Sequence, residues 1–360
     1  MRFSVSEEAA ALRDAASALL SAQATPAVIR AVWTAGAAAC EPRDIWRGLA
    51  SLGLVGAIVP ETSGGLGLDE SALPPVLEQL GYCGLPGPAV ETIAVAAPLL
   101  AAAGHPALAD VLSGSAVVTA QLAAGPATGP DGRVLVPYAP WADYTLLRAA
   151  DGLRLYERDE LKAEPAQAVD RARPLAWVRP RPDRGTLLAP ASAMEARAAW
   201  QRGVLGTAAV LVGLAGRMLS MTADYVKTRH QFGVPVGSFQ AVKHKLADVY
   251  TSTEFARPVV LAAAWALSGR AAVPESAVDP AMDVSAAKVL ASDAAVATAR
   301  AALQCHGAIG YTTEYDLHLY AKRSWALARS WGSADWHRQQ LACALGLVPA
   351  GSPQVGYEER

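Results

Sequence analysis

The sequence predicts a mainly helical protein with a small β domain between two helical parts. Apolar residues recur at three- and four-residue spacing before residue 114 and again after residue 191, which is the period of amphipathic helices. Between these parts, short runs rich in valine, leucine and tyrosine alternate with Pro, Gly and Asp stretches, as strands alternate with turns. At 360 residues the chain is long enough for two or three structural units around a substantial core.

Residues 1–114 are expected to form an N-terminal helical domain. Helical spacing covers residues 6–22, 26–39, 44–52, 71–80 and 89–103. The segment GLVGAIVPETSGGLGLDE lies between the third and fourth of these, and its proline and glycines indicate a loop. Ser71 then stands where the N-cap of the next helix is expected.

The middle and the end of the chain are expected to form two further domains. Residues 115–190 predict a small, mostly antiparallel β domain, with strands at 116–122, 133–136, 144–147, 153–156 and 175–179. Residues 191–345 predict a C-terminal four-helix bundle, with helical segments at 193–228, 239–268, 284–306 and 315–345. Small-residue faces such as AAKVLASDAAVATARAAL suit close helix packing there. Residues 346–360 are predicted to be a tail.

Composition and charge exclude several classes of protein. Apolar residues make up 52% of the chain and charged residues 18%, and the net charge is −2 without a block of like charges. This excludes a disordered chain and argues against nucleic acid or an anionic membrane as a partner. The most apolar stretches are shorter than the roughly 18 residues of a membrane span, and the N-terminal segment carries acids, unlike a signal peptide. We therefore expect no membrane insertion and a cytoplasmic location.

The cysteines and histidines show no metal-ligand spacing. The four cysteines are Cys40, Cys83, Cys305 and Cys343. Because they are far apart and form no CxxC pair, neither a disulfide framework nor a zinc site is predicted, and a reducing compartment fits. His244 and His318 are lone histidines on predicted helices, where surface exposure or core packing is the expected role. No metal site is predicted.

The segment RHQFGVPVGSFQ attracts attention because a cation, an aromatic residue and glycines precede a helix start. Arg229, Phe232 and Gly233 lead into a helix that is expected to begin near Gln240. Oriented backbone amides and a fixed guanidinium make such a place favourable for a phosphate-bearing ligand. The alternative is an ordinary helix–turn–helix connection whose arginine is a solvated surface charge.

Three motifs, together with the order of the domains, resemble the acyl-CoA dehydrogenase family over nearly the whole chain. Residues 229–240 are similar to the family's R-x-x-F-G…F-Q segment. Residues 304–315, QCHGAIGYTTEY, are similar to its Q-x-x-G-G-x-G-[FY] followed by T-E-Y, with Ala308 in place of the second glycine. Residues 60–67, PETSGGLG, match its PE-x-x-GG-x-G loop. The resemblance implies a family fold with FAD as cofactor and oxidation of an acyl-CoA between Cα and Cβ.

The resemblance also implies that the FAD site is shared between subunits. In the family, the arginine and glutamine motifs of one subunit hold the pyrophosphate and adenine of the FAD whose flavin lies in the neighbouring subunit. Arg229 would pair with the pyrophosphate, Phe232 would pack beside it, and Gln240 would hydrogen-bond across the interface. The cofactor contacts carried over in this way are Arg229, Phe232, Gly233, Gln240, Gln304, His306 and Gly307.

The half of the site that holds the flavin departs from the family's pattern. The family's T-E-P-x-A-G-S loop reads VVTAQLAAGPATG here, and its W-[IVT]-T-N strand reads VLVPYAPWADY. Thr119 and the pair Ala142–Asp143 remain as landmarks, while the Gly-Ser and Thr-Asn positions are lost. Trp141 lies too far along the strand to be the flavin-side tryptophan, and we expect it to fill the core or an interface.

The catalytic base is missing as well. Abstraction of the α-proton of a thioester needs a carboxylate whose pKa is raised by burial. The family's usual glutamate falls on Trp331, and its alternative position falls near Gly203. Neither residue is an acid, so no catalytic residue is predicted. Among nearby acids, Asp335 and Glu314 are the candidates for an atypical base.

These observations favour a subunit that donates cofactor contacts without catalysing the reaction. The leading hypothesis is the non-catalytic subunit of a heteromeric, α2β2 acyl-CoA dehydrogenase in lipid β-oxidation, resembling the steroid side-chain type. A homologous partner would supply the flavin pocket and the glutamate and bind most of the acyl-CoA. One alternative is a self-sufficient homomeric oxidoreductase that uses an atypical base such as Asp335. A non-enzymatic structural relative is a further alternative. It does not explain why these residues match the family's FAD motifs.

Overall fold

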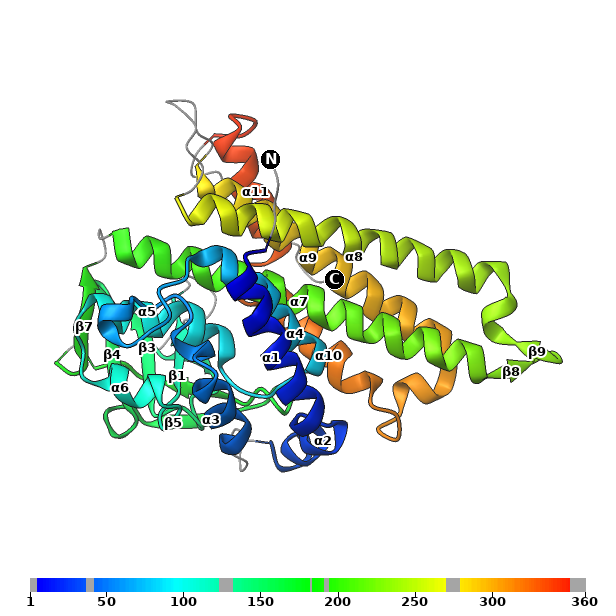
Figure 1. The fold of residues 1–360 in the computed structure, drawn as a ribbon, viewed down its shortest axis with the longest axis horizontal. Coiled ribbons are helices and arrows are strands. Elements are labelled where there is room, and N and C mark those ends of the chain that lie inside the picture. Colours follow the sequence, from blue (N-terminus) through cyan, green and yellow to red (C-terminus); the bar gives the residue numbers. More distant parts are fainter. Residues whose placement is uncertain are drawn as a thin grey trace.

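The computed structural model describes residues 5–36, 42–122, 132–181, 183–190, 194–269 and 279–349. Cys40 and the last eleven residues of the predicted tail lie outside these ranges. Helices at the N-terminus, a small sheet region and a long helical bundle follow one another along the chain (Figure 1), so the predicted fold class is confirmed.

The N-terminal helices pack against the bundle in one continuous apolar core. They are α1 (Glu7–Gln23), α2 (Pro26–Ala35), α3 (Arg43–Ser51), α4 (Leu73–Cys83), the π-helix η5 (Val90–Ala96), α5 (Ala97–Ala102) and α6 (Ala107–Leu112). Ser6 caps α1 by accepting a hydrogen bond from the amide of Ala9 at 3.2 Å. Helix α6 was not predicted, and the segment expected to be one helix at 89–103 consists of η5 and α5. A π-helix is a rare distortion that often lies at functional sites.

The β domain contains two small sheets. Its strands are β1 (Val118–Gln121), β2 (Val134–Pro137), β3 (Tyr144–Arg148), β4 (Gly152–Glu157), β5 (Ala163–Ala166), β6 (Leu175–Val178) and β7 (Thr186–Pro190). One sheet has the order β1-β3-β4-β7 and the other the order β2-β6-β5. All of their pairings are antiparallel except that of β1 with β3. A cluster that includes Val136, Leu147, Tyr156 and Val178 forms an apolar core of its own.

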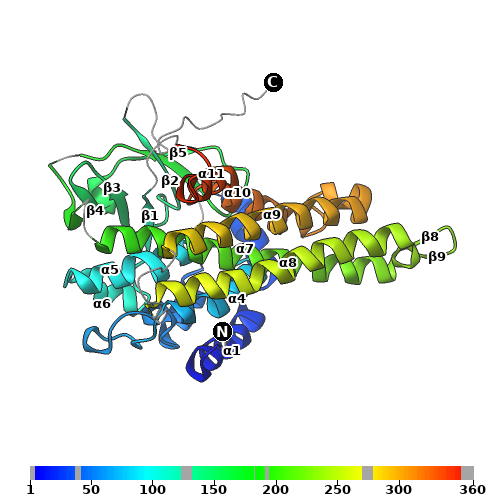
Figure 2. The ribbon, with the colours of Figure 1, turned by 90° about the horizontal axis from the view of Figure 1, so that it is seen from above.

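The C-terminal bundle extends beyond the other two domains at one end (Figures 1 and 2). It contains α7 (Met194–Thr228), α8 (Gln240–Leu267), α9 (Pro280–His306), α10 (Leu317–Arg329) and α11 (Ala334–Ala344). A hairpin of β8 (His230–Gln231) and β9 (Val234–Pro235) joins α7 to α8 and projects at the end of the bundle away from the β domain (Figures 1 and 2). Helix α7 is long and apolar enough to cross a membrane by length and composition, but 67% of its most apolar window is buried in the bundle.

The prediction of a single helix at 315–345 is wrong, because the chain breaks between α10 and α11. After α10, Trp331 and Gly332 adopt positive φ angles of 56° and 89°, which no α-helix contains. Ser333 then starts α11 by accepting a hydrogen bond from the amide of Trp336 at 3.2 Å. The break therefore falls on the residue that the family resemblance equates with the catalytic base.

The three domains meet at a buried ion pair. Arg323 of α10 is 6% exposed and donates from Nε to the carboxylate of Asp170 in the β domain, which is 1% exposed. The same guanidinium donates to the carbonyl of Leu85 in the N-terminal domain and to the carbonyl of Ala172, both at 3.2 Å. Since the C-terminal domain supplies the donor and the other two domains supply the acceptors, this arginine fixes their relative positions.

Candidate functional site

The β8–β9 hairpin holds an aromatic side chain away from the protein. Phe232 lies between the two strands with a φ angle of 53°, and it is 92% exposed. Its ring and that of Phe239 form a T-shaped pair, with ring centroids 6.2 Å apart. A bulky residue in left-handed conformation is strained, and such strain concentrates at functional sites. Packing among the described residues gives no reason for this arrangement.

Next to this aromatic lie an unpaired cation and an uncapped helix. The side chain of Arg229 is exposed and has neither a hydrogen bond nor an ion pair with any residue of the described ranges. Helix α8, 28 residues long, begins at the exposed Gln240 after Phe239, whose side chain offers no cap. An uncapped helix start with a free guanidinium nearby is suited to an anion.

The second predicted motif lies at the same end of the bundle, where α9 ends (Figure 1). Gln304 is exposed, and Gly307 follows with a φ angle of 62° and open space where a Cβ would be. Tyr225 of α7 joins the two motifs, because its ring stacks on His306 at 4.3 Å. The structure therefore brings the residues of both motifs to one exposed end of the molecule.

His306 differs from the other residues of this set because it faces inward. It is 4% exposed and packs against the rings of Tyr225 and Tyr315. Its Nδ1 lies 2.8 Å from the carbonyl of Ala302, and its buried Nε2 has no partner. Burial lowers the pKa of His306 below its usual value, so the ring is held neutral. Its contact with FAD stays a prediction. The ring of His306 is buried, whereas Gly307, which follows it in the chain, is exposed.

The landmark residues on the side expected to hold a flavin have partners within the chain. The hydroxyl of Thr119 is fully buried and donates to the carbonyl of Pro137. Asp143 accepts from the amide of Val117 and from Arg43, and so serves the β domain. Trp141 is 2% exposed in a core cluster, as predicted for a filling residue. The family landmarks in this half therefore have internal partners.

The two positions that the resemblance equates with the base lie in direct contact. Gly203 is in the middle of α7, and Trp331 is in the break before α11. A Cβ built on Gly203 would lie 2.4, 2.5 and 2.6 Å from three atoms of the six-membered ring of Trp331. The indole of Trp331 therefore occupies the space into which a side chain at position 203 would extend.

A buried acid beside Trp331 was missed by the sequence reasoning. Glu91 lies in η5 and is 4% exposed. Burial raises the pKa of the Glu91 carboxyl, and the Arg173 guanidinium and a hydrogen bond from the Trp331 indole oppose this rise. A signal was present, since Glu91 is the lone acid in the apolar run PAVETIAVAAPLL. Such an acid is rarely buried without a role or a partner.

The acids that the sequence offered as atypical bases lie at the surface. The side chain of Asp335 is 84% exposed and pairs with Arg338 at 2.8 Å. Glu314 is exposed in the turn before α10. Neither carboxyl is buried, although proton abstraction next to a thioester requires burial.

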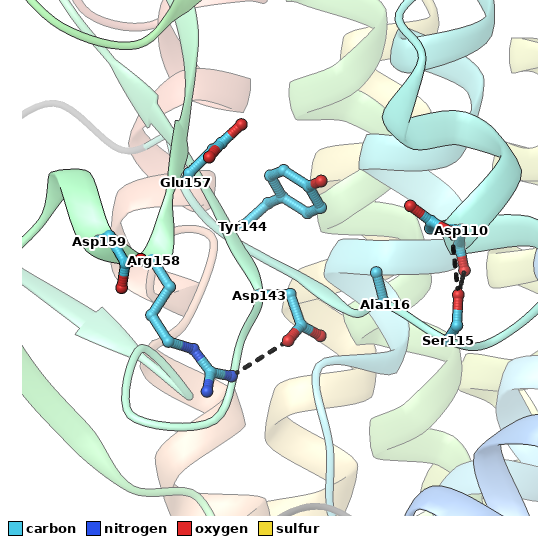
Figure 3. A pocket seen from close by; sticks show the side chains of 8 residues that line it. All are labelled: Asp110, Ser115, Ala116, Asp143, Tyr144, Glu157, Arg158 and Asp159. Atoms are coloured by element: carbon cyan, nitrogen blue, oxygen red, sulfur yellow. Dashed lines mark hydrogen bonds and ion pairs between the residues drawn. The ribbon is translucent and has the colours of Figure 1, made fainter.

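A surface hollow of about 460 Å³ lies between α6 and the ends of β3 and β4 (Figure 3). Its charged lining comprises Asp110, Asp143, Glu157, Arg158 and Asp159. The one arginine pairs with Asp143 at 3.2 Å. Four carboxylates repel phosphate groups, so this hollow is not suited to FAD or coenzyme A. Within the described residues no group of His, Cys, Asp and Glu side chains could hold a metal ion.

Comparisons with known proteins cover most of the chain. Residues 191–346 match the acyl-CoA dehydrogenase C-terminal domain, and residues 6–112 match the N-terminal domain of that family. The chain is 32% identical over 326 residues to the acyl-CoA dehydrogenase IpdE2 of Mycobacterium tuberculosis, with 88% of this chain and 91% of IpdE2 covered.

Solved structures share the fold of this chain. A variant of the Tcur3481-Tcur3483 steroid ACAD is similar with a TM-score of 0.80 and 27% identity, over 96% of this chain and 99% of that chain. The ChsE4-ChsE5 complex from Mycobacterium tuberculosis is similar with a TM-score of 0.81 and 24% identity, over 97% of this chain and 100% of that chain.

Proposed function

Because the chain belongs to the acyl-CoA dehydrogenase family, whose cofactor is FAD, we propose that it is the contact-donating subunit of a heteromeric enzyme. A homologous partner would provide the flavin pocket, the catalytic glutamate and most of the acyl-CoA contacts. The reaction would be the α,β-dehydrogenation of an acyl-CoA, with a steroid side-chain thioester as the substrate class. The assembly would be an α2β2 tetramer in the cytoplasm.

The observation that carries this proposal is the contrast between the two halves of the expected site. At the end of the bundle, Arg229 has no side-chain partner among the described residues, Phe232 is strained and exposed, and Gln304 is exposed. These residues fit the pyrophosphate and adenine of a cofactor whose flavin lies in another chain. When bound there, FAD would supply the two-electron oxidant of the reaction.

The comparisons support the heteromeric part of the proposal. The Tcur3481-Tcur3483 protein is named as a steroid ACAD, and the chain is 27% identical to it. The ChsE4-ChsE5 protein is named as a complex. A partner related to this chain is therefore the expected arrangement.

The self-sufficient homomer stays open as a second candidate because of one observation, the buried Glu91. A carboxyl with a raised pKa is what a base at this place needs. Against this role, the indole of Trp331 fills the space beside Gly203, at the two positions that the resemblance equates with the base. In the active complex, Glu91→Gln should keep activity under the leading proposal and abolish it under the alternative.

Cofactor content tests the proposal directly. The full chain should be produced alone and together with a homologous partner, and bound FAD, oligomer mass and acyl-CoA oxidation measured. We expect FAD and activity only in the complex. Arg229→Ala should weaken FAD binding by about ten- to a hundredfold, which is the value of a charge-assisted contact, whereas the neighbouring exposed Lys227→Ala should not. Stoichiometric FAD and activity in the chain alone would refute the proposal.

A further inference from the structure

We propose that Trp331 is a plug that closes this chain's own acyl pocket, and that removing its indole opens a site for a flat, fused-ring ligand. The inference rests on the proposed function only for the identity of the pocket. The residues that flank Trp331 come from α7, η5 and α11 and from the β domain. These elements therefore converge on the indole, the backbone carbonyl of Trp331 and the neighbouring Ser330.

The seat of the plug is a glycine in a helix. A side chain at position 203 would overlap the ring of Trp331, since a Cβ there would come within 2.4 Å of it. No real Cβ approaches a ring carbon so closely. Helix α7 therefore has room for the indole only because Gly203 carries no side chain. The pair is complementary in shape and fills the space together.

The backbone of the plug is fixed from two sides. His337 of α11 is 1% exposed; its Nε2 donates to the carbonyl of Trp331 at 2.9 Å, and its Nδ1 accepts from the hydroxyl of Ser285 at 3.1 Å. Arg173 of the β domain donates to the hydroxyl of Ser330 at 2.9 Å. These contacts hold Trp331 in its left-handed conformation, with a φ angle of 56°.

The helix before the plug is fixed by a buried lysine. Lys288 of α9 is fully buried and donates to the carbonyls of Leu327 and Ala328 at 3.3 and 3.0 Å, at the end of α10. A cation among the last carbonyls of a helix satisfies groups that have no helical partner. The end of α10, and with it the start of the plug, is therefore anchored to α9.

The indole of Trp331 lies beside a buried acid and a second tryptophan. The buried carboxyl of Glu91 is near enough for the indole N–H to favour its charged form, which lowers the pKa of the carboxyl. The indole ring lies 5.5 Å from the ring of Trp200, and Trp331 is 8% exposed. Glu91 is thus a positioning residue for the plug. This role accounts for an acid in the apolar run of η5 without assigning it catalysis.

The contacts also define the ligand that would replace the indole. The vacated space would be flat, would be lined by the backbone at Gly203 and the ring of Trp200, and would present one carboxyl acceptor, that of Glu91. Apolar cavities made by truncating a buried side chain bind apolar molecules of the lost shape. A fused ring with one N–H or O–H donor fits, and indole is the matched probe.

Ligand binding to the full chain tests the plug. Trp331→Ala, the wild type and Trp336→Ala should be titrated with indole by calorimetry, and the melting temperature measured with and without it. Trp336 is the control because it belongs to the same aromatic cluster but is only partly buried. We expect one indole per Trp331→Ala chain and a raised melting temperature, with no binding in the other two. A folded Trp331→Ala chain that binds no indole, or equal binding by all three, overturns the proposal.

A second measurement keeps the proposal testable if Trp331→Ala fails to fold. Trp331→Phe keeps a ring on Gly203 but removes the N–H, and Glu91→Leu removes the acceptor. In the wild-type background Glu91→Leu should raise the unfolding equilibrium constant about tenfold more than in the Trp331→Phe background, because it leaves a buried donor unpaired. Additive effects would refute the positioning role of Glu91. Both measurements use the chain alone, so a failed FAD experiment with Arg229→Ala leaves their outcome unaffected.

Discussion

Two aromatic residues of this protein share a left-handed backbone conformation but differ in exposure and in the contacts of their side chains. Phe232 and Trp331 have φ angles of 53° and 56°, and each is followed by a glycine with positive φ. Phe232 is 92% exposed and Trp331 is 8% exposed. A left-handed conformation costs roughly 1–2 kcal/mol for such residues. At Trp331 the surrounding contacts offset that cost, whereas at Phe232 the chain offers only an edge contact with Phe239.

The comparison extends to the two arginines that accompany these residues. Arg323 is buried and its guanidinium contacts three acceptors, whereas the exposed Arg229 has no side-chain partner in the part of the chain that the structure describes. Arg323 and Trp331 thus have partners inside the protein, whereas Arg229 and Phe232 lie exposed at the end of the bundle. The proposed function accounts for this difference, because a second subunit would supply the partners that the outer half of the site lacks within the described residues.

The largest expected effect concerns the ion pair that supports the interior. Asp170→Ala leaves Arg323 charged and buried without its carboxylate, which should lower the free energy of unfolding by about 3–5 kcal/mol. Urea unfolding followed by circular dichroism measures this. Asp335→Ala removes an exposed carboxylate from a surface pair, and its effect should stay below about 1 kcal/mol. Equal effects of the two variants would show that the interior does not depend on this pair.

The next effect is a pH dependence of the plug. Burial lowers the pKa of His337 to about 4, well below its usual value near 6.5, so protonation favours the unfolded chain. Its contribution is intact above pH 6.5 and is lost as the pH falls toward 4. Between pH 6.5 and 4.5 the wild type should lose roughly 2–3 kcal/mol more stability than His337→Gln. Parallel pH profiles of the two proteins, measured by urea unfolding, would exclude this titration.

A somewhat smaller effect is expected from filling the seat of the plug. Gly203→Ala places a methyl group against the Trp331 ring and should cost about 1–3 kcal/mol through overpacking. Gly216→Ala in the same helix is the control, because its Cβ would meet Tyr82 at an ordinary 3.7 Å. The control should gain up to about 1 kcal/mol from helix propensity. A stabilising Gly203→Ala, measured by thermal unfolding, would mean that the indole is loosely seated.

Helix periodicity and turn residues predicted most of the fold, and the errors have physical causes. The break at Trp331 was missed because apolar spacing continues through residues 317–345, although Gly332 and Ser333 are a helix stop and a helix start. Strands β5 and β7 were missed because each is a short edge strand that contains proline. An edge strand lacks the alternation that a half-buried strand shows.

The candidate site divides in the same way. The outer residues could be named from the sequence because they are close together in two short motifs. The contact of Gly203 with Trp331 could not, since it joins segments far apart in the chain and depends on the break before α11. Periodicity describes which face of a helix is apolar, but it does not identify the residue packed against it. Glu91 was visible as an isolated acid, and only its burial gives it meaning.

The smallest expected effect addresses Phe232 itself and separates the two ends of the comparison. Phe232→Gly removes the left-handed strain, and glycine's greater freedom in the unfolded chain offsets part of this gain, so the chain alone should become about 0.5 kcal/mol more stable. Phe232→Ala removes the ring and keeps the strain, so it should show no gain. In the complex, both variants should lower FAD content, because both lose the ring. If Phe232→Gly instead destabilises the isolated chain by more than about 1 kcal/mol, then the ring serves this chain's own folding, and the strain at the hairpin tip is no sign of a partner.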